Sequence, residues 1–141
     1  MKVLWFANTP CSATEKLNAS LHGGGWLKSL QKSLLLKEGV NINLSISFIW
    51  DDNIEPFEYD NCKFYPIHLG GRKTKFSRLL KRLFVNEVKN EECVIKQMIE
   101  IIHIESPDII HIHGTEECFG LIQKYTEKPV VISIQGMIGP Y

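Results

Sequence analysis

Hydrophobic residues follow strand-like spacing in five parts of this chain. Continuous apolar runs, typical of strands buried on both faces, occur at residues 2–7 (KVLWFA), 107–114 (PDIIHIHG) and 128–136 (KPVVISIQG). In 42–50 (INLSISFIW) apolar residues take every second position, which predicts a strand with one less buried face. Residues 63–69 (KFYPIHL) predict a short strand near a sheet edge, because Pro66 has no N–H to donate.

Apolar residues three or four apart predict helices between these strands. Trp26, Leu27, Leu30 and Leu34 form one side of a helix over 26–37, Lys28, Gln31 and Lys32 lie between them, and Gly39 ends it. Further helices are expected at 75–84, at 87–105 and at 116–126, and residues 10–25 are expected to form a long loop. Alternating strands and helices predict an α/β fold, a Rossmann-like doubly wound parallel sheet in a single domain over 1–141.

Composition narrows the class of protein. Sixteen basic and sixteen acidic residues give no net charge, so nothing overall attracts the chain to nucleic acid, and we expect no nucleic-acid partner. The four cysteines include no Cys-x-x-Cys pair, which favours buried or half-buried free thiols in a reducing compartment. The first apolar run is too short for a signal peptide, and we therefore expect a cytoplasmic protein.

Three consecutive glycines, Gly23, Gly24 and Gly25, stand between the first strand and the first long helix. Backbone without side chains lets an anion approach the N–H groups at a helix N-terminus. The residues match neither the phosphate-binding Gly-Lys-Ser/Thr loop nor the G-x-G-x-x-G turn. Two interpretations therefore stand, an anion-binding loop and a plain flexible turn, and the position after the first strand favours the first.

Two histidines, His111 and His113, share one face of the strand within 107–114. We expect His111 to be hydrogen-bonded inside the fold, and His113, at the exposed carboxyl end of the strand, to contact a ligand. The nearest further metal-ligand types are Glu116, Glu117 and Cys118, which follow no recognised spacing. We therefore predict no metal site.

The segment 75–84 separates apolar from basic residues. Its apolar positions are Phe76, Leu79, Leu80, Leu83 and Phe84, and its basic positions are Lys75, Arg78, Lys81 and Arg82. Such a helix can lie on an anionic membrane surface, at the inner face of the membrane for a cytoplasmic protein. The alternative is a helix that packs on the sheet with its basic face in water.

The order MKVLWFAN, a glycine loop opening a helix, PDIIHIHG and PVVISIQG resembles the N-terminal domain of family 4 glycosyltransferases of the GT-B fold. This resemblance implies retaining transfer of a sugar from a nucleotide-sugar donor to a hydroxyl of a sugar or lipid-linked acceptor, with no cofactor and no metal. It implies that Gly23, Gly24 and Gly25, with Trp26, approach the donor diphosphate. It also implies that His113, followed by Gly114, faces the reacting sugar, and that Gln135 and Gly136 border the acceptor.

Two departures from the family qualify this expectation. Gln135 is neutral where members often carry histidine or arginine, and the C-terminal donor-binding domain is absent from these 141 residues, so the chain alone is expected to be inactive. A stand-alone flavodoxin-like binding or regulatory module is the alternative. A third interpretation is a complete small enzyme with His113 as general base and Glu116 or Glu117 as its partner.

Overall fold

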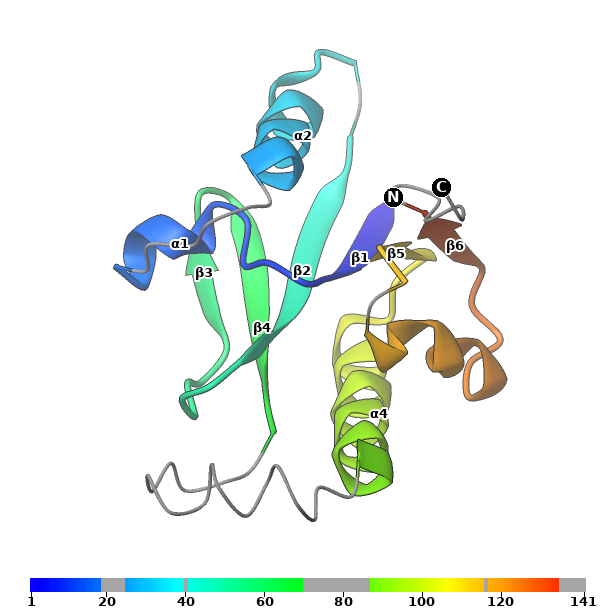
Figure 1. The fold of residues 1–141 in the computed structure, drawn as a ribbon. Helices are drawn as coiled ribbons and strands as arrows, with labels where there is room; N and C mark the ends of the chain where they lie inside the picture. The colour runs from blue at the N-terminus through cyan, green and yellow to red at the C-terminus, as the bar shows by residue number, and fades with distance from the viewer. Residues whose placement is uncertain (19–24, 40, 70–86, 116, 135–141) are drawn as a thin grey trace, which may run out of the picture.

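The computed structural model describes residues 1–18, 25–39, 41–69, 87–115 and 117–134 (Figure 1). They form one six-stranded sheet in the order β3-β4-β2-β1-β5-β6. The strands are β1 (Lys2–Ala7), β2 (Asn43–Trp50), β3 (Phe57–Tyr59), β4 (Cys62–His68), β5 (Ile109–His113) and β6 (Val130–Ser133). Neighbouring strands pair in parallel except for β3 and β4, which are antiparallel.

The strand order defines a Rossmann-like sheet. From β1 the chain moves outward through β2 to β4, and then crosses back to place β5 and β6 on the other side of β1. Counting parallel strands along the chain, their order is third, second, first, fourth, fifth, as in the Rossmann sheet, whereas a flavodoxin sheet has its third strand on the other side of the first. The expected α/β fold is confirmed, and the described sheet does not have the flavodoxin order of our alternative interpretation.

Helices cover both faces of this sheet (Figure 1). The helices are α1 (Ala13–Lys16), α2 (Gly25–Leu36), α4 (Glu87–Glu105) and the 3-10 helix η1 (Cys118–Lys124). Val3, Trp5 and Ala7 of β1 pack in a core with α1 and α2. Leu4 and Phe6 point the other way, into a second core with α4 and η1. We call these two sides the α2 face and the α4 face.

The alternating residues of β2 lead to a wrong prediction about its burial. Ser45 and Ser47, expected on a less buried face, are both buried beneath α4. Each hydroxyl has a partner, because Ser45 donates to Glu105 Oε2 at 2.9 Å and Ser47 donates to the Tyr65 carbonyl at 2.9 Å. A polar side chain can therefore lie in the core where a second polar group reaches it.

Several boundaries differ from the sequence prediction. The expected loop over 10–25 contains α1, and its residues 19–24 lie outside the described part. The expected helix over 116–126 is a 3-10 helix, η1, a form common in short pieces. The strand predicted near an edge is β4, which lies second from the edge because β3, which was not predicted, pairs outside it. The pairing of β3 ends at Phe64, so Pro66 has no partner strand on that side. The expected basic helix over 75–84 falls outside the described residues.

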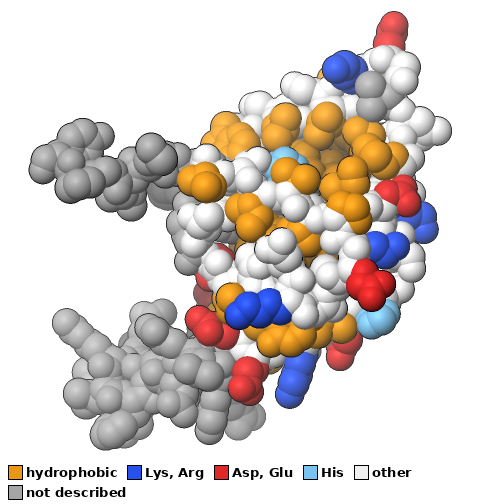
Figure 2. Space-filling model, turned by 90° about the vertical axis from the view of Figure 1, so that its right-hand side faces the viewer, with side chains coloured by type: hydrophobic (Ala, Val, Ile, Leu, Met, Phe, Trp, Pro, Cys, Tyr) orange, Lys and Arg blue, Asp and Glu red, His pale blue; other side chains and the backbone are white. Residues whose placement is uncertain are grey.

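The last described strand, β6, is more exposed than predicted. It was expected to be buried, yet Val131 and Ile132 are exposed, as is Ile134 just past the strand, and β6 forms the edge of the described sheet. Figure 2 shows apolar side chains gathered on this side of the molecule. A continuous apolar run predicts a strand correctly but does not by itself show which neighbours cover it.

Gln31 joins α2 to the segment that follows β1. The sequence places Gln31 between the apolar positions of the predicted helix, next to Lys32, yet its side chain is 0% exposed. Its Oε1 accepts the Ser12 N–H at 3.0 Å, and its Nε2 donates to Ser12 Oγ at 2.7 Å and to Cys62 Sγ at 3.3 Å. The amide thus satisfies buried polar groups that α1 alone does not.

We expect Gln31→Leu to lower the free energy of unfolding by about 1–3 kcal/mol, because the buried Ser12 N–H would lose its acceptor. Urea denaturation followed by circular dichroism measures the change. The control is Ser33→Ala, an exposed position on the same helix, which should change stability by less than about 0.5 kcal/mol. Equal stability of Gln31→Leu and the wild type would contradict this role.

Glu105, the last residue of α4, ties that helix to the sheet. Its buried carboxylate accepts hydrogen bonds from the hydroxyls of Tyr65 and Ser45 and from Lys63 Nζ at 3.2 Å, and its carbonyl accepts one from Lys2 Nζ at 3.3 Å. Burial alone would raise its pKa, but the three hydrogen bonds and the charge of Lys63 lower the pKa below its ordinary value. Glu105 is therefore an ionised group in the core, held by partners from β2 and β4.

The states of the cysteines and the lengths of the helices complete the description of the fold. All four cysteines are free, and Cys11 and Cys62 are buried while Cys93 and Cys118 are half-buried, as expected. In the described part of the chain no helix combines the length and the apolar character needed to cross a bilayer.

Candidate functional site

His113 is the last residue of β5 and lies beside Ala7, the last residue of β1. The order in which the chain adds strands reverses between β1 and β5. The strands β2 and β4 are added on one side of β1, and β5 and β6 are added on the other. In open parallel sheets, ligands bind outside the carboxyl ends of the strands at this switch point. The fold therefore places His113 where a ligand site is expected.

Aromatic rings surround the His113 imidazole. Its centroid lies 4.4 Å from that of Trp5, 3.9 Å from that of His111 and 5.7 Å from that of Trp26. Trp5 and Trp26 both meet it edge-on. The expected exposure is wrong, because these rings leave His113 only 2% exposed.

Both ring nitrogens of His113 lack a hydrogen-bond partner among the described residues. An unpaired buried polar group costs free energy, so two on one ring need an explanation. Glu117, described and exposed, does not bond to the ring, and Glu116 lies outside the described residues, so the role of either as partner of a general base stays a prediction.

The imidazole of His113 is neutral at pH 7. Burial, and secondarily the neighbouring His111, lower its pKa from 6.5 to about 4. A neutral imidazole carries one N–H donor and one acceptor nitrogen. A hydroxyl group, which can both donate and accept, can pair with either of these two atoms.

His111 and Gly114 already have partners inside the fold. His111 Nε2 lies 2.7 Å from Ser133 Oγ of β6, which confirms the expectation of a hydrogen-bonded His111. The Gly114 N–H donates to the Ser133 carbonyl at 2.9 Å, so it is not free for a phosphate oxygen. Gly114 has a φ of 93°, in the left-handed region that favours glycine, so this residue turns the chain where β5 ends.

The structure brings Trp26 to His113 but describes only part of the predicted loop. Gly25 is the first residue of α2, and a Cβ at this position would meet nothing within 4 Å. Trp26, in the first turn, is 45% exposed and reaches the His113 ring. The predicted residues Gly23, Gly24, Gln135 and Gly136 lie outside the described part, so their roles stay predictions.

Sequence reasoning missed His68, which ends β4 on the same edge of the sheet. Its Nδ1 is buried and lacks a partner among the described residues, as does Thr9 Oγ1 just past β1. The backbone of His68 is held by Gln97 of α4, whose Oε1 accepts its N–H at 3.0 Å and whose Nε2 donates to its carbonyl at 2.8 Å. The available signal was its place at the end of a predicted strand, 63–69.

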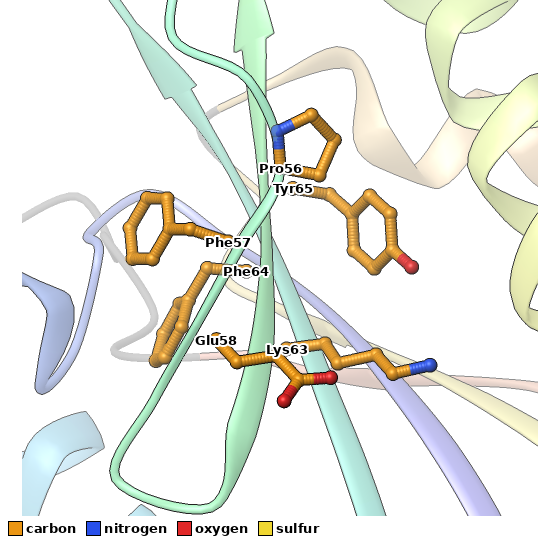
Figure 3. A pocket seen from close by; sticks show the side chains of 6 residues that line it. All are labelled: Pro56, Phe57, Glu58, Lys63, Phe64 and Tyr65. Atoms are coloured by element: carbon orange, nitrogen blue, oxygen red, sulfur yellow. The ribbon is translucent and has the colours of Figure 1, made fainter.

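Two of the cavities lined by described residues lie away from this edge of the sheet. One, of about 190 Å³, is lined by Pro56, Phe57, Glu58, Lys63, Phe64 and Tyr65 at the β3–β4 edge. Figure 3 shows Tyr65 and Lys63 extending to one side of the strands, while Phe57 and Phe64, which are stacked, extend to the other. Because Tyr65 and Lys63 both bond to Glu105, their polar groups are already engaged. The second, of about 430 Å³, lies between the end of α4 and residues 125–128.

The fold and this edge define a Rossmann-like α/β domain with a polar site at its switch point. No family model and no curated protein matches the chain. Among solved structures, it is similar to sucrose-phosphate synthase from Thermosynechococcus elongatus, with a TM-score of 0.59 and 10% identity over 96% of this chain and 33% of that one. It is also similar to UDP-GlcNAc 2-epimerase from Neisseria meningitidis bound to UDP-GlcNAc, with a TM-score of 0.47 and 13% identity over 94% of this chain and 32% of that one. The chain thus spans about a third of each solved structure, and the likeness to the synthase supports the fold.

Proposed function

We propose that this chain is the N-terminal, acceptor-side domain of a retaining GT-B glycosyltransferase. The enzyme would transfer a sugar from a nucleotide-sugar donor to a hydroxyl of a sugar or lipid-linked acceptor. The observation that carries this proposal is His113, which is buried, neutral at pH 7 and unpartnered at both nitrogens at the carboxyl end of β5. The similarity in fold to sucrose-phosphate synthase supports it.

The start of α2 supplies the second part of the proposed site. The first N–H groups of a helix have no partner within it and carry a partial positive charge, which attracts a diphosphate. Trp26, in that first turn, contacts His113, so the helix end and the imidazole border the same region. A sugar hydroxyl on His113 and a diphosphate at α2 would lie next to each other, as they do in a nucleotide sugar.

The chemistry expected of this domain is positioning. His113 would bind a hydroxyl of the reacting sugar, and α2 would stabilise the charge that develops on the leaving diphosphate. A second, C-terminal domain would hold the nucleotide, so we expect this chain to be inactive alone. The nucleotide sugar is a substrate in this proposal, and no cofactor or metal is required. Contact of residues 75–84 with an anionic membrane surface stays a prediction, as does location at the inner face of the membrane.

Calorimetric titration of the full-length protein with UDP-glucose, UDP-GlcNAc, GDP-mannose, UDP and GDP tests the proposal. We expect one nucleotide sugar to bind, and His113→Ala to weaken that binding by about 10- to 100-fold, because the hydrogen bond between the imidazole and a sugar hydroxyl is lost. Binding of the matching nucleoside diphosphate should change much less, since His113 contacts the sugar.

The control variant is His103→Ala, which removes an exposed histidine on α4 and should bind like the wild type. The 141-residue chain alone should bind donors far more weakly than the full-length protein. Failure of every nucleotide sugar to bind, or wild-type affinity of His113→Ala, would contradict the proposed function. Tight donor binding by the 141-residue chain would contradict the two-domain arrangement.

A further inference from the structure

The buried side-chain polar atoms without a partner gather along one edge of the described sheet. They are Thr9 Oγ1, His68 Nδ1 and both ring nitrogens of His113. His68 ends β4, His113 ends β5, and Thr9 follows β1 by two residues, so each stands at the carboxyl end of a parallel strand. The other buried side-chain nitrogen and oxygen atoms of the described residues have partners. A polar ligand at this edge would therefore supply the hydrogen bonds that these atoms lack.

His68 has an aromatic neighbour on the α2 face. Cys62 and Phe64 of β4 pack in the core of that face, and side chains alternate along a strand, so His68 points to the same face. Trp50, the last residue of β2, pairs directly with His68 and packs against the same core. Both side chains are half-buried, and they stand side by side at the ends of two paired strands, a pair that we call the His68 corner.

Contacts with neighbouring residues hold both members of the His68 corner. Gln97 accepts from the His68 N–H and donates to the His68 carbonyl. Trp50 meets Phe48 edge-on, with 5.9 Å between ring centroids. The corner is thus built on two strands and braced by α4, which is typical of a preorganised binding site.

The distance between the His68 corner and His113 limits the ligand. The sheet order places β4 and β5 three strand spacings apart, with β2 and β1 between them. At a strand spacing of about 4.8 Å, the two histidines are separated by about 14 Å across the sheet. This separation exceeds the length of a single sugar ring.

We infer that the His68 corner binds a hydroxylated ring of the acceptor, so that the acceptor is a carbohydrate of at least two sugar units. Indole faces pack against the C–H faces of sugars, and the unpaired His68 Nδ1 would hydrogen-bond a ring hydroxyl. This inference rests on the proposed function, because the separation is counted from the donor sugar that His113 would hold. A donor sugar at His113 and one acceptor ring beside it leave the His68 corner to a second acceptor ring. The inference goes further in selecting a sugar over a simple lipid alcohol as acceptor.

Carbon-13 NMR of the histidine Cε1–H groups in the full-length protein tests the inference. The probes are glucose, as a single ring, and the disaccharides maltose, cellobiose, lactose and chitobiose. We expect at least one disaccharide to shift the His68 signal and to leave the exposed His103 signal unchanged. His68→Ala and Trp50→Leu should each weaken the binding of that disaccharide by about 5- to 10-fold, while the affinity for the nucleotide sugar changes by less than about threefold.

Thermal unfolding of both variants checks that they keep the fold, which the Gln97 clamp on the backbone favours. No shift of the His68 signal with any disaccharide would overturn the inference, as would a shift caused by free uridine instead. Unchanged disaccharide affinity in both variants would also overturn it. If disaccharides shift the His68 signal but no nucleotide sugar binds, the His68 corner is a carbohydrate site and the proposed function is wrong. If a nucleotide sugar binds but no disaccharide shifts the His68 signal, the proposed function is supported and this inference is wrong.

Discussion

Glu105→Ala is expected to lower the free energy of unfolding by about 3–5 kcal/mol, because removing one member of a buried, hydrogen-bonded charge cluster leaves its partners unpaired. The hydroxyls of Ser45 and Tyr65 would both lose their acceptor inside the core. Lys63, which is half-exposed, can turn to water and adds little to the loss. Urea denaturation followed by circular dichroism measures the change.

Two further variants separate charge from hydrogen bonding at this position. Glu105→Gln keeps an acceptor oxygen for the hydroxyls, so its loss of stability should be smaller than that of Glu105→Ala. Glu100→Ala removes an exposed carboxylate from the same helix and should change stability by less than about 0.5 kcal/mol. A loss below about 1 kcal/mol for Glu105→Ala would show that the cluster does not hold α4 to the sheet.

The cluster around Glu105 should make the free energy of unfolding depend on pH. The pKa of Glu105 in the folded protein lies below its ordinary value of 4.5, so the unfolded chain binds the proton more readily. The contribution of Glu105 is therefore complete above pH 4.5 and is lost as the pH falls through the lower, folded pKa. The stability of Glu105→Gln should fall less steeply than that of the wild type over this acid range.

Trp5→Ala is expected to destabilise the protein by about 3–5 kcal/mol, since it removes the largest side chain from the core of the α2 face. Trp5 is 1% exposed in the middle of β1, and its ring also supports the imidazole of His113 at 4.4 Å. Thermal or urea unfolding measures the stability. The affinity for the ligand proposed at His113 should fall as well, because a cavity would open beneath the ring.

Trp5→Phe keeps an aromatic ring and should lose less stability than Trp5→Ala. Leu36→Ala, at a position that is 81% exposed, is the matched control for a large apolar residue and should leave stability unchanged within about 0.5 kcal/mol. If Trp5→Ala were no less stable than Leu36→Ala, the core of the α2 face would not depend on this ring.

The sequence predicts the elements of this fold better than their neighbours. Apolar spacing locates the strands at 2–7, 42–50 and 63–69 and the long helix that ends at Glu105, because one strand or helix imposes its own period. Which polar residues are buried depends on contacts between distant segments. Ser45 and Gln31 meet partners 60 and 19 residues away, and local spacing contains no record of such pairs.

The candidate site shows the same division. The sequence singled out His113 because it ends a predicted strand that carries two histidines. The structure confirms that His113 lies at the switch point, while its role stays a prediction. Its burial was not foreseen, because Trp26 reaches it from another element 87 residues earlier in the chain. His68 escaped attention because a lone histidine becomes informative only when its unpaired atom and its place beside Trp50 are known.

The placement of the tryptophans gives this protein a built-in optical probe. The chain contains three tryptophans, and all of them lie on the α2 face, Trp5 and Trp26 against His113 and Trp50 beside His68. Intrinsic fluorescence therefore reports on the edge of the sheet that carries both proposed contacts, with no label attached. Variants that keep only Trp26 or only Trp50 would let the emission from each end be recorded separately as a ligand is added.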